Sequence, residues 1–314
     1  MRDYGLDSST PTRVLGLLVA LLAAAAVLMG GATREGHMLN AGVRLLGLGV
    51  LLFGAIRIAQ RPIQPSWRRP LWLAGAILAV PLVQMVPLPP WLWTNLPGRG
   101  EIAAIYEAAG MPAPWHGLGL NPEGALNAAL ALLPGLAMFV ATLTLRARAR
   151  MLVVGITLVC ALAGTLLGLV QVAQGEESAL RFYATTNPGS AVGFFSNRNH
   201  QASLQLVAMP LVAGLLAAVF PDRKGWPSLP ALLVAGGVLT LLAIATIMTD
   251  SRAGLVLYPL VVAACALTMV RERLPKLPGR AVLAMLGALS VLGGLLAAAA
   301  LMARPALMEE VEKD

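Results

Sequence analysis

The feature of this 314-residue chain that most constrains its fold is a series of long apolar stretches separated by short loops. A stretch of about 20 mostly apolar residues forms a helix that crosses a bilayer, where backbone polar groups must be bonded within the helix. The sequence therefore predicts an all-α polytopic membrane protein with about nine transmembrane helices. The expected spans are residues 14–31, 39–59, 70–87, 125–144, 151–173, 199–220, 230–249, 252–270 and 281–302.

Composition agrees with this fold class and excludes several others. Hydrophobic residues make up 58% of the chain and charged residues 12%, and the mean hydropathy is +0.76. The formal net charge of +8 does not predict nucleic-acid binding, because the basic residues lie in short loops between apolar stretches rather than in a stripe. Cys160 and Cys265 lie inside apolar stretches, and the chain has no metal-ligand spacing, P-loop or dinucleotide motif. We therefore expect no metal and no cofactor.

Lysine and arginine positions predict the orientation, since basic residues concentrate in cytoplasmic loops. If the N-terminus is cytoplasmic, each inner loop is basic and fifteen of the 23 basic residues lie inside. These are Arg2, Arg13, Arg57, Arg61, Arg68, Arg69, Arg146, Arg148, Arg150, Arg223, Lys224, Arg271, Arg273, Lys276 and Arg280. The first stretch could instead be a signal peptide, because it follows a basic residue and ends in small residues.

The outer side carries the longer loops. Residues 88–124 are expected to form an interfacial loop in which Trp91, Trp93 and Trp115 suit the membrane–water boundary. Residues 101–109 could be a short helix lying on the bilayer. Two interpretations of the tryptophans stay open, anchoring of the loop and direct contact with a substrate. A second outer loop, 174–198, precedes the most polar motif of the chain.

Two arginines stand at the starts of apolar stretches. Arg198 lies in VGFFSNRNH and Arg252 in TDSRAG, and both helices would begin at the outer leaflet. Ser196, Asn197 or Asn199 could cap the first helix and Asp250 or Ser251 the second. Arginine binds phosphate oxygens through two parallel hydrogen bonds, and helix N-termini attract anions. The motifs thus predict a diphosphate site formed by Arg198, Arg252 and the adjacent Asn197, Asn199 and Ser251.

Each of these residues also has a simpler interpretation. An arginine at a helix end often anchors the helix by extending to the interface. Arg252 could pair with Asp250, two residues away. His200 could act as a general base or only as a polar group at the helix start.

Beyond these arguments, the segments GFFSNRNHQASLQLVAMPL and TDSRAGLVL resemble the two signatures of the O-antigen ligase and polymerase superfamily. The tryptophan-rich outer loop is similar too. The resemblance implies a GT-C-like helical bundle in a bacterial inner membrane, with residues 88–124 and the active face in the periplasm. Such enzymes, which build cell-surface polysaccharides such as lipopolysaccharide, transfer a glycan from undecaprenyl diphosphate to an acceptor glycolipid, glycan or protein hydroxyl. They are metal-independent glycosyltransferases, and the resemblance makes Arg181 a competitor of Arg198 for the diphosphate.

The chain departs from the family pattern at its C-terminal end. Family members continue through further helices and a periplasmic loop that supplies a histidine, the expected general base. Here residues 303–314 correspond to the start of that loop, and no such histidine follows. Three explanations stay open: a fragment or truncated product, which we expect, substitution by His200, or an incomplete enzyme.

Two rival functions remain. A polyisoprenoid-lipid transporter or flippase would line a midplane aqueous path with Gln84, Gln171 or Thr246. A non-catalytic membrane subunit would bind the lipid diphosphate without transferring a glycan.

Overall fold

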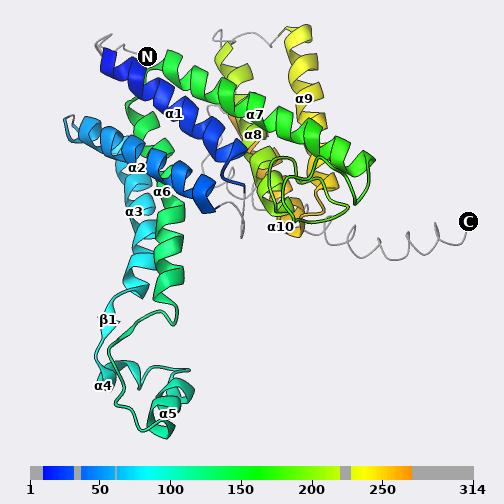
Figure 1. The fold of residues 1–314 in the computed structure, drawn as a ribbon. Coiled ribbons are helices and arrows are strands. Elements are labelled where there is room, and N and C mark those ends of the chain that lie inside the picture. The colour runs from blue at the N-terminus through cyan, green and yellow to red at the C-terminus, as the bar shows by residue number, and fades with distance from the viewer. Residues whose placement is uncertain (1–9, 32–36, 61, 220–227, 271–314) are drawn as a thin grey trace, which may run out of the picture. The chain divides into compact units, whose positions relative to one another are not determined.

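A computed structural model describes residues 10–31, 37–60, 62–219 and 228–270 of the chain. Its long helices are α1 (Thr10–Leu28), α2 (His37–Ala59), α3 (Pro65–Gln84), α6 (Pro122–Thr144), α7 (Ala147–Ala173), α8 (Arg198–Val219), α9 (Leu229–Met248) and α10 (Arg252–Val270) (Figure 1). Four short elements lie between α3 and α6: β1 (Pro87–Leu88), α4 (Pro90–Trp93), α5 (Gly100–Ala108) and β2 (His116–Gly117).

These helices make the described chain an all-α, multi-pass membrane protein. Five helical segments are long and apolar enough to cross a bilayer: Met38–Ala59, Pro122–Thr144, Ala147–Ala173, Arg198–Ala218 and Leu229–Met248. Two shorter apolar helices are Thr12–Leu28 and Arg252–Thr268. Helix α3, which covers most of the expected span 70–87, is not among these seven segments. The expected span 281–302 and the segment 303–314 lie outside the described residues, so the number nine stays a prediction.

Helix surfaces carry the apolar side chains that a lipid environment requires. On α9, Leu233 and Val234 are 66% and 68% exposed in the isolated chain. Such exposure is unfavourable in water, whereas hydrocarbon solvates these side chains as well as a protein interior does. The small buried residues of the same helices, such as Ala235, are the ones that contact neighbouring helices.

The described residues fall into two compact units, which we treat separately. Unit 1 comprises the described parts of Met1–Leu22 and Ala41–Arg150, and unit 2 those of Ala23–Asn40 and Met151–Asp314. In unit 1, α2 approaches α6 through glycines: a Cβ on Gly47 would lie 3.0 Å from the Cα of Pro134, and one on Gly54 would lie 3.1 Å from the Cα of Ala141. Small residues of this kind let membrane helices pack backbone to backbone.

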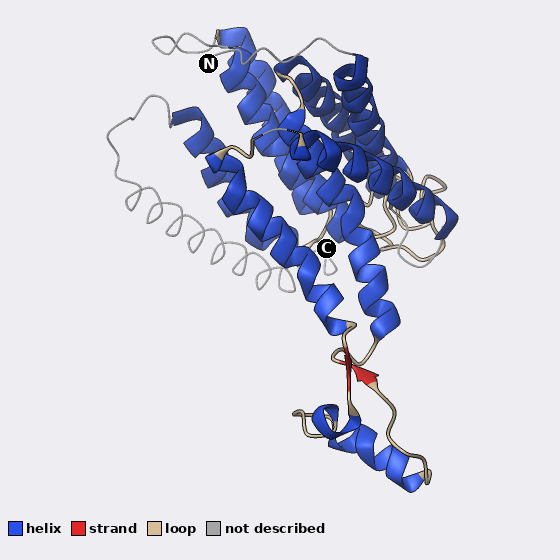
Figure 2. Cartoon of the chain, turned by 90° about the vertical axis from the view of Figure 1, so that its left-hand side faces the viewer, coloured by secondary structure: helices blue, strands red, loops and turns tan. Residues whose placement is uncertain are grey.

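Unit 1 also contains a small lobe, residues 87–121, beyond the ends of α3 and α6 (Figure 2). Strands β1 and β2 pair antiparallel at its base. The indole of Trp93 is fully buried and donates a 2.8 Å hydrogen bond to the carbonyl oxygen of Pro114. The Tyr106 ring meets that indole edge-on, with ring centroids 6.2 Å apart.

The lobe distinguishes the three tryptophans by burial and contains the expected short helix. Trp93 is fully buried in the core of the lobe, whereas Trp91 and Trp115 are 72% and 66% exposed. Helix α5 covers nearly the whole predicted segment 101–109. Arg99, just before α5, is buried and donates hydrogen bonds to the carbonyl oxygens of Gly117 and Leu118.

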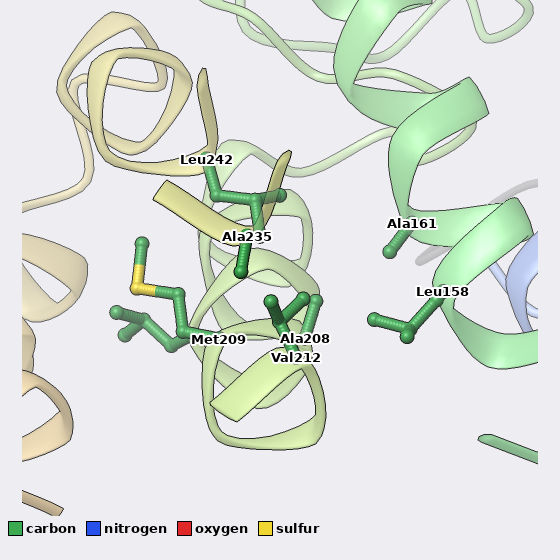
Figure 3. Close-up of a cluster of buried hydrophobic side chains, with 8 residues drawn as sticks. Leu158, Ala161, Ala208, Met209, Val212, Ala235 and Leu242 are labelled. Carbon is green, nitrogen blue, oxygen red and sulfur yellow. The ribbon is translucent and has the colours of Figure 1, made fainter. Parts of the chain in front are cut away.

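The core of unit 2 lies between α7, α8 and α9 (Figure 3). Its buried members are Leu158, Ala161, Leu206, Ala208, Met209, Val212, Ala235 and Leu242. Tyr258, Val261 and Cys265 of α10 pack against this cluster. Helix α8 is therefore surrounded by α7, α9 and α10 within unit 2. This packing fixes the position of the residues at the start of α8.

Candidate functional site

The two sequence motifs meet in unit 2. The hydroxyl of Ser251, just before α10, donates a 2.7 Å hydrogen bond to the side-chain oxygen of Asn199 in the first turn of α8. One turn further along, a Cβ on Gly254 would lie 2.8 Å from the Cβ of Ala202. The second contact lies three residues after the first on each helix, at Ala202 and Gly254. Helices α8 and α10 therefore start side by side and run in the same direction. The sequence prediction that these two helix starts share one level is consistent with this geometry.

A three-residue turn holds the start of α10 in place. Thr249, Asp250 and Ser251 join α9 to α10, and Asp250 adopts a left-handed conformation with a φ of 58°. The Ser251 hydroxyl also accepts a 3.0 Å hydrogen bond from the amide of Gly254, which makes Ser251 the N-cap of α10. Of the two caps left open by the sequence, the structure therefore selects Ser251.

The start of α8 is capped twice. The side-chain oxygen of Asn197 accepts a 2.8 Å hydrogen bond from the amide of Asn199, so Asn197 is the N-cap among the three candidates. The side-chain oxygen of Asn187 accepts a 2.9 Å hydrogen bond from the amide of Arg198. Since these two amides already have partners, an anion at this end of α8 would be bound mainly by side chains.

The guanidinium groups of Arg198 and Arg252 have no partner among the described residues. Arg198 is half-buried and Arg252 is exposed. Within the described ranges, no hydrogen bond or ion pair engages either guanidinium. As far as the described residues go, the five N–H donors of each guanidinium group could therefore bind an anion.

Arg181 has a different role in this structure. Its Nη1 donates hydrogen bonds of 3.1 Å and 3.0 Å to the carbonyl oxygens of Asn187 and Ser190. It therefore closes the loop that precedes α8, and Asn187 of that loop in turn caps α8. Its Nε and Nη2 are buried and have no hydrogen-bond partner among the described residues. The structure places Arg181 beside the loop backbone and Arg198 at the helix start, so the two are not equivalent.

His200 follows Asn199 on α8 and is exposed. Its ring meets the Phe195 ring edge-on, with centroids 5.9 Å apart. In the part of the chain that the structure describes, no hydrogen bond orients the imidazole, so a base–carboxylate pair of the kind found in catalytic triads is not formed there.

Outside the membrane spans, partial burial raises the pKa of the Tyr183 phenol above its usual value of 10.0, which keeps this loop residue neutral.

Sequence reasoning missed the residues that shape the loop. The Gln171 carboxamide, fully buried on α7, bonds to the backbone of Val192 and Gly193. Gln171 was predicted only as a wall of a transport path, as were Thr246, which bonds to the Leu242 carbonyl oxygen, and Gln84, which is exposed on α3. The signal that could have pointed to Gln171 is a single amide in an otherwise apolar helix.

Among the residues that the structure describes, no group of three His, Cys, Asp or Glu side chains could hold a metal ion.

Comparison with known proteins finds no match: no family model, no curated protein and no solved structure is similar to this chain.

Proposed function

We propose that this protein is an O-antigen ligase-like membrane glycosyltransferase of a bacterial inner membrane. It would move a glycan from undecaprenyl diphosphate to an acceptor hydroxyl on the periplasmic side, with its N-terminus in the cytoplasm. The orientation rests on the basic inner loops of the sequence.

The observation that carries the proposal is the hydrogen bond between Ser251 and Asn199. It brings the two signature segments together, so that Arg198 and Arg252 each lie next to one end of that bond in the sequence. Two guanidinium groups that no described residue engages, beside paired helix starts, have the charge and donor geometry that a diphosphate requires. The site lies at the ends of apolar helices, where the headgroup of a membrane lipid would be.

In the proposed reaction the acceptor oxygen attacks the anomeric carbon of the donor glycan. The bond from that carbon to the diphosphate oxygen breaks, and undecaprenyl diphosphate leaves with the electron pair. Arg198 and Arg252 would stabilise the charge that develops on the leaving group. The acceptor proton passes to a base, for which His200 is the candidate in the described chain, one residue after Asn199.

The test uses the full chain in lipid nanodiscs with an undecaprenyl-diphosphate-linked oligosaccharide and a hydroxyl acceptor. We expect transfer by the wild type, a loss of about 100-fold or more for Arg252→Ala, as when a charge-stabilising donor is removed, and partial retention for Arg252→Lys. Arg148→Ala, at an exposed arginine in unit 1, is the matched control and should transfer normally. Undiminished transfer by a normally inserted Arg252→Ala variant would remove that arginine from the mechanism.

The same preparation separates the rival functions. Binding of undecaprenyl diphosphate without transfer would identify a non-catalytic binding subunit. Movement of a fluorescent polyisoprenoid lipid between leaflets of proteoliposomes would identify a transporter. Absence of both binding and transfer would overturn the proposal.

A further inference from the structure

Gln171 forms an unusual set of hydrogen bonds for a side chain inside a membrane helix. Its Nε2 donates to the carbonyl oxygens of Leu180 and Gly193, both at 2.9 Å. Its Oε1 accepts from the amide of Gly193 at 2.9 Å and from that of Val192 at 3.3 Å. The carboxamide therefore pairs with both the N–H and the C=O of Gly193, as a neighbouring β-strand would.

Gly193 can take this position only because it has no side chain. Its φ of 58° lies in the left-handed region. A Cβ there would collide with the side-chain oxygen of Gln201 on α8, and it would lie 2.6 Å from the carbonyl oxygen of Gly164 on α7. Gly193 is therefore enclosed between α7 and α8, and Gln171 binds its backbone within that enclosure.

The enclosed segment leads directly into the candidate site. Only four residues separate Gly193 from Arg198. Ser196 within them is held by the carbonyl oxygen of Gly31, to which its hydroxyl donates at 3.0 Å. Because the path from Gly193 to the first turn of α8 is so short, we expect a displacement of Gly193 to be transmitted to Asn197 and Arg198.

We propose that Gln171 is a positioning residue for the diphosphate site: its carboxamide fixes Gly193, and through it the place of Arg198 relative to Ser251. This proposal rests on the proposed function for the identity of the ligand. The fixing of the loop itself does not depend on that function. Gln171 is fully buried and bonds only to backbone atoms, so it would act through the loop and not by contact with a ligand.

Three variants of the full chain in nanodiscs test the proposal. Gln171→Leu removes all four hydrogen bonds and keeps the volume similar. Gln171→Glu keeps one donor and one acceptor for Gly193 when the introduced acid is protonated, but a carboxylate would face the two carbonyl oxygens of Leu180 and Gly193. Gln205→Leu is the matched control, because Gln205 is equally buried and its described bond goes to Thr165 on α7, away from the loop.

Hydrogen exchange of the segment 190–200 is the first measurement. We expect faster exchange at Val192 and Gly193 in Gln171→Leu and no change in this segment in Gln205→Leu. Unchanged exchange in Gln171→Leu would overturn the proposal whether or not the protein binds a lipid diphosphate.

Binding of undecaprenyl diphosphate is the second measurement. Gln171→Leu should bind at least about tenfold more weakly at every pH, as expected when a binding group is displaced by about an ångström. The affinity of Gln171→Glu relative to the wild type should rise as the pH is lowered, a recovery that a change in packing alone would not produce. Wild-type affinity in a Gln171→Leu variant with loosened exchange would refute the positioning role. Absence of binding by the wild type would refute the proposed function and leave the exchange result to decide the fixing of the loop.

Discussion

Ser251 and Asn199, fifty-two residues apart in the sequence, share a 2.7 Å hydrogen bond between their side chains. The same Ser251 hydroxyl accepts the amide of Gly254 and caps α10. One side chain therefore both starts a helix and joins it to another.

This double role predicts that removing the Ser251 hydroxyl lowers the free energy of unfolding more than removing the Asn199 side chain does. Ser251→Ala loses the cap and the bridge, and should lower the free energy of unfolding by about 1–2 kcal/mol, since a lost cap alone typically costs about 1 kcal/mol. Asn199→Ala loses only the bridge and should cost less. Chemical denaturation in detergent measures both changes.

A double-mutant cycle isolates the bridge. The combined Ser251→Ala and Asn199→Ala variant should show a coupling of about 0.5–1.5 kcal/mol. Ser203→Ala, at an exposed hydroxyl on the same helix that bonds to the Asn199 carbonyl oxygen, is the control and should change stability little. Strictly additive effects would mean that the bridge contributes nothing.

Gly193→Ala should lower the thermal stability of the protein more than most other substitutions in unit 2. Its backbone is left-handed, which costs a residue with a Cβ about 1–2 kcal/mol, and the new methyl group would also collide with Gln201 and Gly164. Gly189→Ala is the matched control, because its φ is 72° but the nearest atom to its Cβ, Oε1 of Glu176, is 3.4 Å away. Thermal unfolding should show a clearly larger loss for Gly193→Ala, and equal losses would exclude the steric contribution.

The close contact between Gly254 and Ala202 predicts that a second substitution, Ala202→Gly, restores the stability lost in Gly254→Ala. Gly254→Ala places two Cβ atoms 2.8 Å apart and should separate the starts of α8 and α10. Adding Ala202→Gly removes the opposing methyl group and should restore both thermal stability and ligand binding. Gly236→Ala on α9, where no atom lies within 4 Å, should be neutral or slightly stabilising. A double variant as unstable as Gly254→Ala alone would show that the contact is not the cause.

The lobe predicts different outcomes for two neighbouring tryptophans. Trp93→Ala empties the lobe core and removes the bond to Pro114, a change that typically costs about 3–5 kcal/mol locally. Limited proteolysis of the folded protein should then cut within residues 87–121. Trp91→Ala, at a largely exposed side chain, should leave the lobe resistant, and equal sensitivity of both variants would contradict the assigned core.

Hydropathy predicted the existence of the helices better than their ends. The expected span 70–87 corresponds to α3, which begins at Pro65, and the span 151–173 corresponds to α7, which begins at Ala147. Both helices extend into arginine-containing segments, because backbone hydrogen bonding continues where apolar composition stops. A hydrophobic window detects only the part of a helix that hydrocarbon would surround.

The sequence singles out the residues of the candidate site but not the hydrogen bonds that connect them. Arg198 and Arg252 are conspicuous because charges are rare beside apolar helices. Their relation depends on Ser251 and Asn199, and no local pattern reveals a bond across fifty-two residues. Arg181 shows the same limit, since its partners are backbone carbonyl oxygens whose position depends on the fold of the loop.

Tryptophans of the lobe illustrate a further limit. Trp91 and Trp93 are two residues apart, and composition treats them alike. Only the packing of Tyr106 and Pro114 around one of them decides which is buried.

The bond between Ser196 and Gly31 has a consequence for biogenesis. Both the amide and the hydroxyl of Ser196 donate to this one carbonyl oxygen, 165 residues earlier in the chain. A ribosome needs roughly 8–33 s to synthesise that interval at about 5–20 residues per second. Residues around Gly31 therefore emerge long before Ser196 exists, so this contact between the ends of a long interval can form only late in synthesis.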